Sequence, residues 1–176
     1  MLNRMWRAAR LDASLYEEVE ADSKATGQAM VVVVLSSLAT GIGGLTEGGV
    51  VGLLVGIGMG LLGWGLWAYL NYLIGGRLWK EAQTHADWGQ LARVMGFAST
   101  PRLLSVLALV PIPAFRALVY LVATVWTWIA MVIAVRQALD YKSTLRAVVV
   151  TGLGWLVNAI VLTLVQVVLI DTLFGG

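Results

Sequence analysis

Apolar and polar residues are segregated into long blocks along this chain. Four blocks are almost wholly apolar or small, at about residues 28–46, 49–74, 114–135 and 147–170, and charged residues gather between them. An α-helix rises 1.5 Å per residue, so about 20 apolar residues are needed to cross the hydrocarbon layer of a bilayer. The pattern therefore predicts an all-α protein with four membrane-spanning helices in these blocks.

A fifth apolar region lies between the second and third of these blocks and is interrupted. Ser99-Thr100-Pro101 has the form of a helix start, with proline at the first helical position. Pro111 and Pro113 then end the apolar run. We expect an amphipathic helix over Trp88–Ala98, followed by a short membrane helix from Pro101 to Val110 within a span of about 101–113.

The distribution of lysine and arginine indicates how many times the chain crosses the membrane. If the N-terminus is inside and the chain crosses five times, Arg116 is the only lysine or arginine in the outside loops. This distribution follows the positive-inside rule. If the interrupted region turned back instead, Arg136, Lys142 and Arg146 would lie outside. We therefore predict a five-helix transmembrane bundle over residues 28–176 in the inner (cytoplasmic) membrane, with the N-terminus cytoplasmic and the C-terminus outside.

The segment 1–27 precedes this transmembrane domain and is predicted to be cytoplasmic or interfacial. Its apolar residues recur at helical spacing, as Leu2, Met5, Trp6 and Ala9. Arginines flank this stripe, so the helix suits either the surface of an anionic leaflet or a packed site on the protein. Ser14-x-x-Glu17 reads as a capping box that begins a second, acidic helix. The candidate contacts for anionic lipids or a partner are Arg4, Arg7, Arg10, Arg93 and Arg102.

Composition supports a membrane protein and excludes several kinds of chemistry. Charged residues are 12% of the chain, against about 25% in soluble domains, and mean hydropathy is +0.83. There is no cysteine, and His85 is the single histidine, which excludes thiolate metal sites and a bis-histidine haem within one subunit. No nucleophile–base pair or metal cluster can be assembled, so we expect neither a cofactor nor an enzyme. The net charge of +2 is spread along the inner loops, which gives no reason to expect nucleic acid.

Glycines in the second block have two possible explanations. Gly58-Met-Gly60-Leu-Leu-Gly63 matches the dinucleotide fingerprint G-x-G-x-x-G, but no strand or turn flanks it, so the match is judged accidental. Spacing instead places a glycine-zipper face on one side of a helix: Gly48, Gly52, Gly56, Gly60 and Gly63. Such a face permits close helix packing, either within the chain, where Gly41, Gly43 and Gly44 are candidate partners, or in a homodimer.

A few polar residues lie within the apolar blocks. Thr151, Asn158 and Gln166 share one face of the last helix, and Asn71 is a candidate partner. Interhelical hydrogen bonds explain this face better than a polar pathway does. Arg102 either extends to the inner headgroups or binds a lipid phosphate or a partner's carboxylate.

The order of several stretches resembles a known family, the bacterial members of the Yip1-domain membrane proteins. These stretches are "RAARLDASLYEEVEAD" followed by "ATGQAMVVVVLSSLATGIG", then "GWGLWAYLNYLIGGRLW", "MGFASTPRLL" and "VWTWIAMVIAVRQALDYKSTLRAV". The resemblance implies five membrane helices with a cytoplasmic N-terminus. Eukaryotic relatives are associated with Rab GTPases and vesicle traffic. This chain departs from them because its cytosolic N-terminal region is only about 27 residues long, so the trafficking role is not transferred.

We therefore expect a non-enzymatic membrane scaffold or partner-binding module. Its expected partners are anionic lipids at the basic inner loops and membrane or cytoplasmic proteins, and a second copy of the chain is a further candidate. An accessory subunit of a larger, bioenergetic membrane complex is the first alternative, and a small transporter is the second.

Overall fold

The computed structural model describes residues 1–41 and 45–174, and within these ranges the chain forms helices and no strands. Descriptions of side chains exclude residues 45–48 and 170–174 as well. The α-helices are α1 (Leu2–Ala9), α2 (Ala13–Ala21), α3 (Ala25–Gly41), α4 (Leu45–Asn71), α5 (Trp88–Ala98), α6 (Pro113–Ala138) and α7 (Thr144–Phe174). Two further elements wind differently: the π-helix η2 (Tyr72–Leu78) continues α4, and the 3₁₀-helix η3 (Thr100–Leu109) continues α5.

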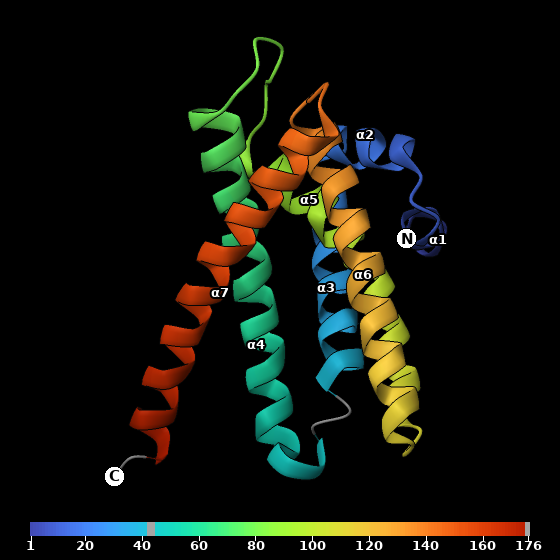
Figure 1. Ribbon diagram of the computed structural model, residues 1–176, viewed down its shortest axis with the longest axis vertical. Helices are drawn as coiled ribbons and strands as arrows, with labels where there is room; N and C mark the ends of the chain where they lie inside the picture. Colours follow the sequence, from blue (N-terminus) through green and yellow to red (C-terminus); the bar gives the residue numbers. More distant parts are fainter. Residues whose placement is uncertain (42–44, 175–176) are drawn as a thin grey trace.

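Five helical segments run in alternating directions along the long axis of the molecule: α3, α4, α5 with η3, α6, and α7 (Figure 1). The short helix α2 and the connections 79–87 and 139–143 lie at one end, which we call the cap end, and α1 lies next to α2 beside the middle part of α6. The turn before α6 and the last residues of α7 lie at the opposite end, which we call the open end. Three stretches are long and apolar enough to cross a membrane, namely Gly49–Leu78, Pro113–Ala138 and Thr144–Leu169, while Ala25–Gly41 is a shorter apolar helix.

The observed helices extend past several predicted limits. The first begins at Ala25 instead of residue 28, but it ends at Gly41, and Leu45 and Thr46, which were predicted to end it, belong to α4. The second continues through the π-helix to Leu78 instead of ending near residue 74. α6 and α7 also extend three residues further into the cap end. The hydrophobic pattern underestimated these limits because the additional turns contain polar residues, among them Thr26, Arg77, Arg136 and Thr144. Gly49, with φ of 55° and ψ of −154°, interrupts α4 where the second span was expected to begin.

α5 occupies the predicted residues Trp88–Ala98, and from Leu91 onward it is buried on every side. Asp87 caps its N-terminus in a capping box with Gln90. From Leu91 to Pro101 every residue is buried, because α2, α3, α4 and α6 all contact this helix. A Cβ at Gly96 would lie 2.6 Å from the Cβ and 3.1 Å from the Cα of Ala29, so this glycine lets α5 contact the backbone of α3.

The 3₁₀ winding of η3 explains how so short a segment reaches the open end. A 3₁₀-helix rises about 2.0 Å per residue, so the ten residues of η3 extend about 20 Å instead of the about 15 Å of an α-helix. Runs of this length are uncommon because their hydrogen bonds are poorer. Here α3 and α6 pack along the whole segment, which supplies tertiary contacts that a free 3₁₀-helix lacks.

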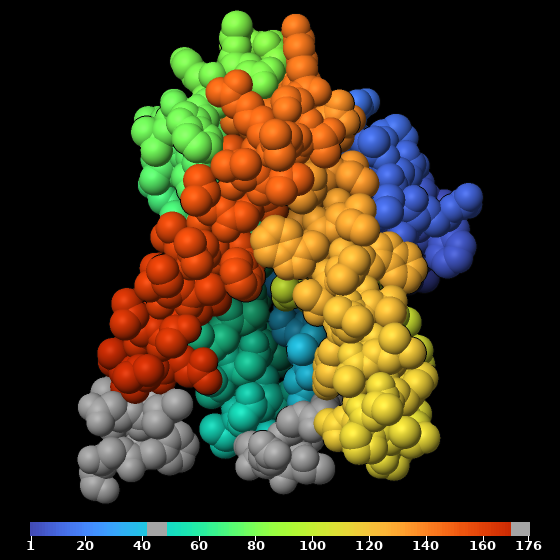
Figure 2. All heavy atoms as spheres, viewed as in Figure 1, coloured from blue at the N-terminus to red at the C-terminus, as the bar shows by residue number. Residues whose placement is uncertain are grey.

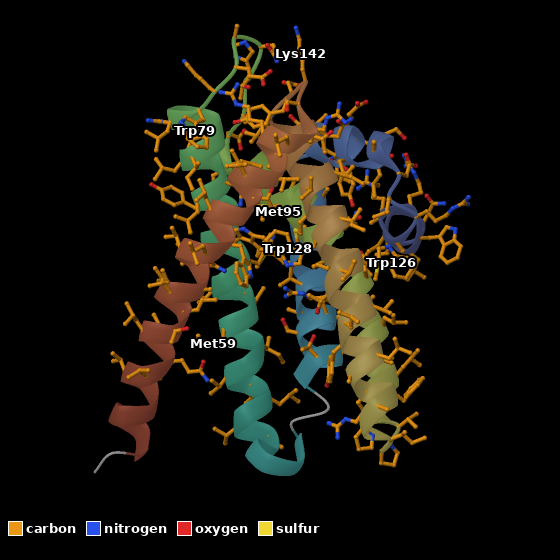
Figure 3. All side chains as sticks on the ribbon, in the orientation of Figure 1. Met59, Trp79, Met95, Trp126, Trp128 and Lys142 are labelled. Atoms are coloured by element: carbon orange, nitrogen blue, oxygen red, sulfur yellow. The ribbon has the colours of Figure 1, made fainter. Side chains whose placement is uncertain are left out.

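The hydrophobic core lies in the half of the molecule nearer the cap end. Its largest fully buried side chains include Tyr16, Leu91, Met95, Phe97 and Leu139, and Figure 3 shows Met95 and Trp128 between the helices. The half nearer the open end instead exposes aliphatic side chains, among them Val50, Leu54, Leu118, Leu121, Leu164 and Val167. An exposed apolar surface of this extent is compatible with a lipid environment.

Candidate functional site

Ion pairs fasten α1 to α2 at the cap end. Arg4 Nε lies 2.8 Å from Glu18 Oε1, and Arg4 Nη2 lies 2.9 Å from Asp22 Oδ2. Arg7 pairs with Asp12 at 2.8 Å and also with Glu18. Two of the predicted lipid-contacting arginines therefore turn toward the acidic helix of their own chain. Arg10 forms no ion pair with any residue that the structure describes.

The predicted capping box at Ser14 and Glu17 is wrong. The N-cap of α2 is Asp12, whose Oδ1 accepts hydrogen bonds from the Ser14 backbone N–H at 3.0 Å and the Ser14 hydroxyl at 2.7 Å. The hydrogen bonds from Ser14, followed by the one from Arg7, lower the pKa of Asp12 to about 2. An ionised aspartate next to the first N–H groups of a helix is favoured by the helix dipole, which explains why Asp12 is preferred over Ser14.

α1 packs on the protein with one face and leaves another face open. Met5 and Ala8 are buried, whereas Leu2 and Trp6 are 77% and 65% exposed. Trp126 of α6 donates its indole N–H to the carbonyl of Ala9 at 2.8 Å, which holds α1 against α6 (Figure 3). One face of this helix is therefore packed on the protein, as one of the two predictions for it had it. Contact of its open face with lipid stays a prediction.

Arg93 is buried and binds the end of α2. Its Nε donates to the carbonyl of Val19 at 3.0 Å, and its Nη2 donates to the carbonyl of Glu20. The last carbonyls of a helix lack partners within the helix, and a cation is favoured there by the dipole. Arg93 therefore joins α5 to α2 inside the molecule, at 9% exposure, instead of reaching lipid.

The two connections at the cap end interlock through side-chain bonds to backbone. Thr84 Oγ1 donates to the carbonyl of Leu139 at 2.7 Å, and Arg146 Nη2 donates to the carbonyl of Trp79 at 2.8 Å. Arg146 also pairs with Glu81 at 3.2 Å. The Tyr141 hydroxyl lies 2.9 Å from the carbonyls of both Gly75 and Trp79, in and just after the π-helix. Sequence reasoning missed this arrangement because its partners lie far apart in the chain and form no motif.

The glycine face contacts the rest of the chain at only part of its length. A Cβ at Gly60 would collide with Ser37, and one at Gly63 would lie 2.9 Å from Leu162. No described atom lies within 4 Å of the corresponding position at Gly52 or Gly56. Gly43 and Gly44 lie outside the described residues, as do the surroundings of Gly48. The G-x-G-x-x-G match lies within the helical part of α4, without the turn that a phosphate-binding loop requires.

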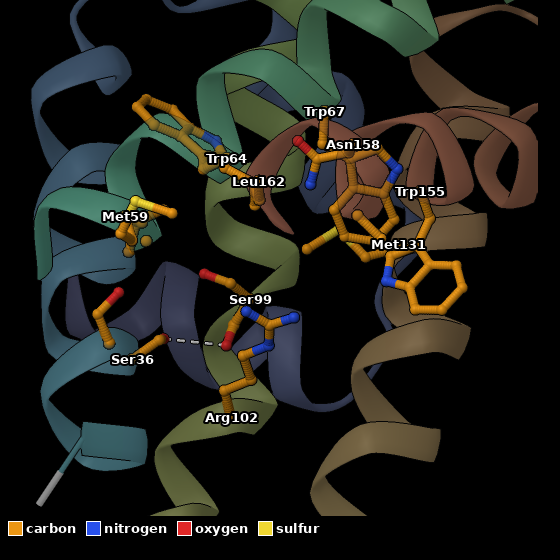
Figure 4. A pocket seen from close by; sticks show the side chains of 15 residues that line it. Ser36, Met59, Trp64, Trp67, Ser99, Arg102, Met131, Trp155, Asn158 and Leu162 are labelled. Carbon is orange, nitrogen blue, oxygen red and sulfur yellow. Dashed lines mark hydrogen bonds between the residues drawn. The ribbon is translucent and has the colours of Figure 1, made fainter. Parts of the chain in front are cut away.

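A cavity of about 220 Å³ lies between α3, α4, η3, α6 and α7 (Figure 4). The guanidinium of Arg102 points into it, and no described carboxylate lines it or pairs with Arg102. Its other polar lining residues are Ser36, Ser37, Ser99 and Asn158. Ser36 donates to the carbonyl of Ser99 at 3.0 Å, which fixes α3 against the start of η3.

The predicted polar face is only partly brought together. Thr151 and Asn158 are buried, but Gln166 is exposed toward the open end. The side-chain amide of Asn71 donates to the carbonyl of Trp67 in its own helix at 2.8 Å. The Trp67 indole N–H in turn donates to the carbonyl of Thr151 at 3.2 Å. The oxygens Asn71 Oδ1, Thr151 Oγ1 and Asn158 Oδ1 are buried without a hydrogen-bond partner.

A helical chain with long apolar helices and a polar cap at one end is a membrane protein of the α-helical, multi-pass class. The family model of the Yip1 domain matches residues 13–165, which is most of the chain. The chain therefore belongs to the Yip1 family, as its sequence resemblance indicated. Searches of curated proteins and of solved structures give no match. No group of three or more potential metal ligands occurs in the described part of the chain, and His85 lies exposed in a loop.

Proposed function

We propose that this Yip1-family protein is a non-enzymatic membrane scaffold that binds a partner protein at its cap end. The observation that supports the proposal is the interlocked cap. Four stretches that are distant in the sequence, namely α1–α2, the connection 79–87, α5 and the connection 139–143, are joined there by hydrogen bonds and ion pairs. A surface fixed in advance loses little conformational entropy on binding, which favours affinity for a partner.

The surface of this cap carries both signs of charge. Its exposed side chains include Glu17, Lys24, Lys80, His85, Asp87 and Lys142. Charges of this kind set the orientation and the rate of association of a protein partner. The trafficking partners of eukaryotic relatives are not part of this proposal.

The proposal also assigns the cap to the cytoplasm, with five crossings and the C-terminus outside. Two observations support this topology. The five helical segments alternate in direction (Figure 1), and every lysine and arginine except Arg102 and Arg116 belongs to the cap end or to a helix segment bound to it. Cytoplasmic loops of membrane proteins carry such an excess of positive charge.

Site-specific photo-crosslinking in the native host tests the scaffold proposal. A photoreactive residue at His85 or Lys142 should give one discrete adduct with a protein, and Arg146→Ala should weaken it by releasing the connection 79–87. The same photoreactive residue at Leu121 or Leu164, on the exposed apolar surface, is the matched control and should react mainly with lipid. Adducts with integral membrane proteins at the control positions, and none at the cap, would instead support the accessory-subunit alternative.

A further inference from the structure

Arg102 is a cation without a counter-ion in the described part of the molecule. It lies in the first turn of η3, where the residue is exposed among apolar side chains, and its guanidinium points into the cavity (Figure 4). Arg4, Arg7 and Arg146 each have a carboxylate partner, and Arg93 binds backbone carbonyls. A charge in such surroundings is costly unless an anion or several dipoles stabilise it. A negative group bound in the cavity would lower this cost.

The other polar atoms of the cavity are suited to a phosphate group. The Ser37 hydroxyl and the Asn158 amide line the same cavity, and no described protein group hydrogen-bonds to either side chain. Asn158 is only 6% exposed, and its side-chain N–H groups are the donors that it can offer to an anion in the cavity. A guanidinium with neighbouring hydroxyl and amide donors binds an oxyanion, and arginine matches phosphate through paired N–H donors.

The size and apolar walls of the cavity indicate a headgroup and not a whole ligand. At about 220 Å³ it is smaller than the about 300–1,000 Å³ typical of sites that enclose a small molecule. Met59, Met131, Trp155 and Leu162 form much of its remaining wall. The space-filling view shows the surface hollowed between α7 and α6, with α3 and α4 behind it (Figure 2). Hydrocarbon chains attached to a headgroup in the cavity can leave through this recess into the bilayer.

We propose that the cavity binds the phosphate group of an anionic phospholipid, with the Arg102 guanidinium as its counter-ion and Ser37 and Asn158 as further hydrogen-bond partners. The acyl chains run from the cavity toward the open end, along the surface where Gly52 and Gly56 leave α4 without side chains. This site is independent of partner binding at the cap, so either proposal can fail while the other holds.

Native mass spectrometry of the detergent-purified, delipidated protein tests this site. Phosphatidylglycerol is the anionic probe, and phosphatidylcholine with the same acyl chains is the zwitterionic control. We expect one phosphatidylglycerol per chain, preferred over phosphatidylcholine by about tenfold or more. Both lipids offer a phosphate to Arg102, but phosphatidylcholine also brings a second cation, its choline group, close to the guanidinium. Arg102→Gln should remove this preference. Arg116→Gln, at the start of α6 and outside the cavity lining, is the matched control and should retain it.

Two further measurements keep the test decisive. If Arg102→Gln fails to fold, Ala159→Phe, which fills the cavity and leaves the arginine in place, should lower phosphatidylglycerol binding to the same extent. Inorganic phosphate at millimolar concentration should not displace the lipid. Equal retention of phosphatidylglycerol by wild type and Arg102→Gln, equal binding of both lipids, or displacement by free phosphate would each overturn the assignment to an anionic phospholipid.

Discussion

Arg93 and Arg102 lie on the same pass of the chain, yet their surroundings differ. Arg93 binds the carbonyls that end α2, and Arg102 faces a cavity with no carboxylate. Both were candidate lipid or partner contacts from the sequence, because an arginine near an apolar run supports that interpretation. What separates them is the tertiary arrangement: the end of α2 reaches Arg93, and no described acidic residue reaches Arg102.

Glu20 makes the docking of α2 dependent on pH. Burial raises its pKa to about 7, and the negative charge of Asp140 adds to this, against the opposing charge of Arg93. Because the folded-state pKa lies above the ordinary value of 4.5, the protonated form favours the docked helix. Docking should therefore be strongest below about pH 4.5, and its stability should fall as pH rises toward about 7.

Hydrogen exchange of the α2 amides, corrected for the intrinsic effect of pH, measures this dependence. Wild type should lose protection between pH 5 and pH 8, Glu20→Gln should show no such loss, and Asp140→Asn should show a smaller one. A wild-type helix with the same corrected protection at both pH values would contradict the proposed role of Glu20.

The positions of the helices could be predicted from the sequence, but the type of helical winding in each could not. The hydrophobic blocks located four long helices, and the Ser99-Thr100-Pro101 break separated α5 from η3 at the correct place. The π winding of 72–78 and the 3₁₀ winding of 100–109 were not predicted, because each depends on packing against distant segments. The same holds for the burial of α5 and for the cavity, whose lining comes from five separate helical elements.

Tyr141 stabilises the π-helical end of α4. Its hydroxyl lies within hydrogen-bond distance of the carbonyls of Gly75 and Trp79, which the irregular winding leaves accessible. Tyr141→Phe should destabilise the protein by about 1–3 kcal/mol, since a buried carbonyl loses its partner. Tyr69→Phe, at an exposed residue of α4, should have little effect. Thermal unfolding in detergent compares the two, and equal midpoints would show that the hydroxyl contributes nothing to η2.

At the scale of the whole molecule, the proposed five-pass topology predicts a pattern of chemical labelling. The chain contains no cysteine, so single cysteines introduced at Lys80, Ile112 and Lys142 report their own positions. A membrane-impermeant maleimide should label Ile112→Cys in intact cells or right-side-out vesicles, and Lys80→Cys and Lys142→Cys only after lysis. Labelling of Lys142→Cys in intact cells would mean that α5 and η3 do not cross the bilayer.

The enclosure of α5 has a consequence for biogenesis. A segment whose residues from Leu91 to Pro101 are all covered by other helices has little exposed surface to offer to lipid when it leaves the translocon. Two of its neighbours, α3 and α4, are synthesised before it, and α6 follows it. We therefore expect α3 and α4 to stay close together until α5 packs against them, and α6 to complete the assembly. Nascent chains that end before α6 should consequently remain sensitive to quality-control proteases.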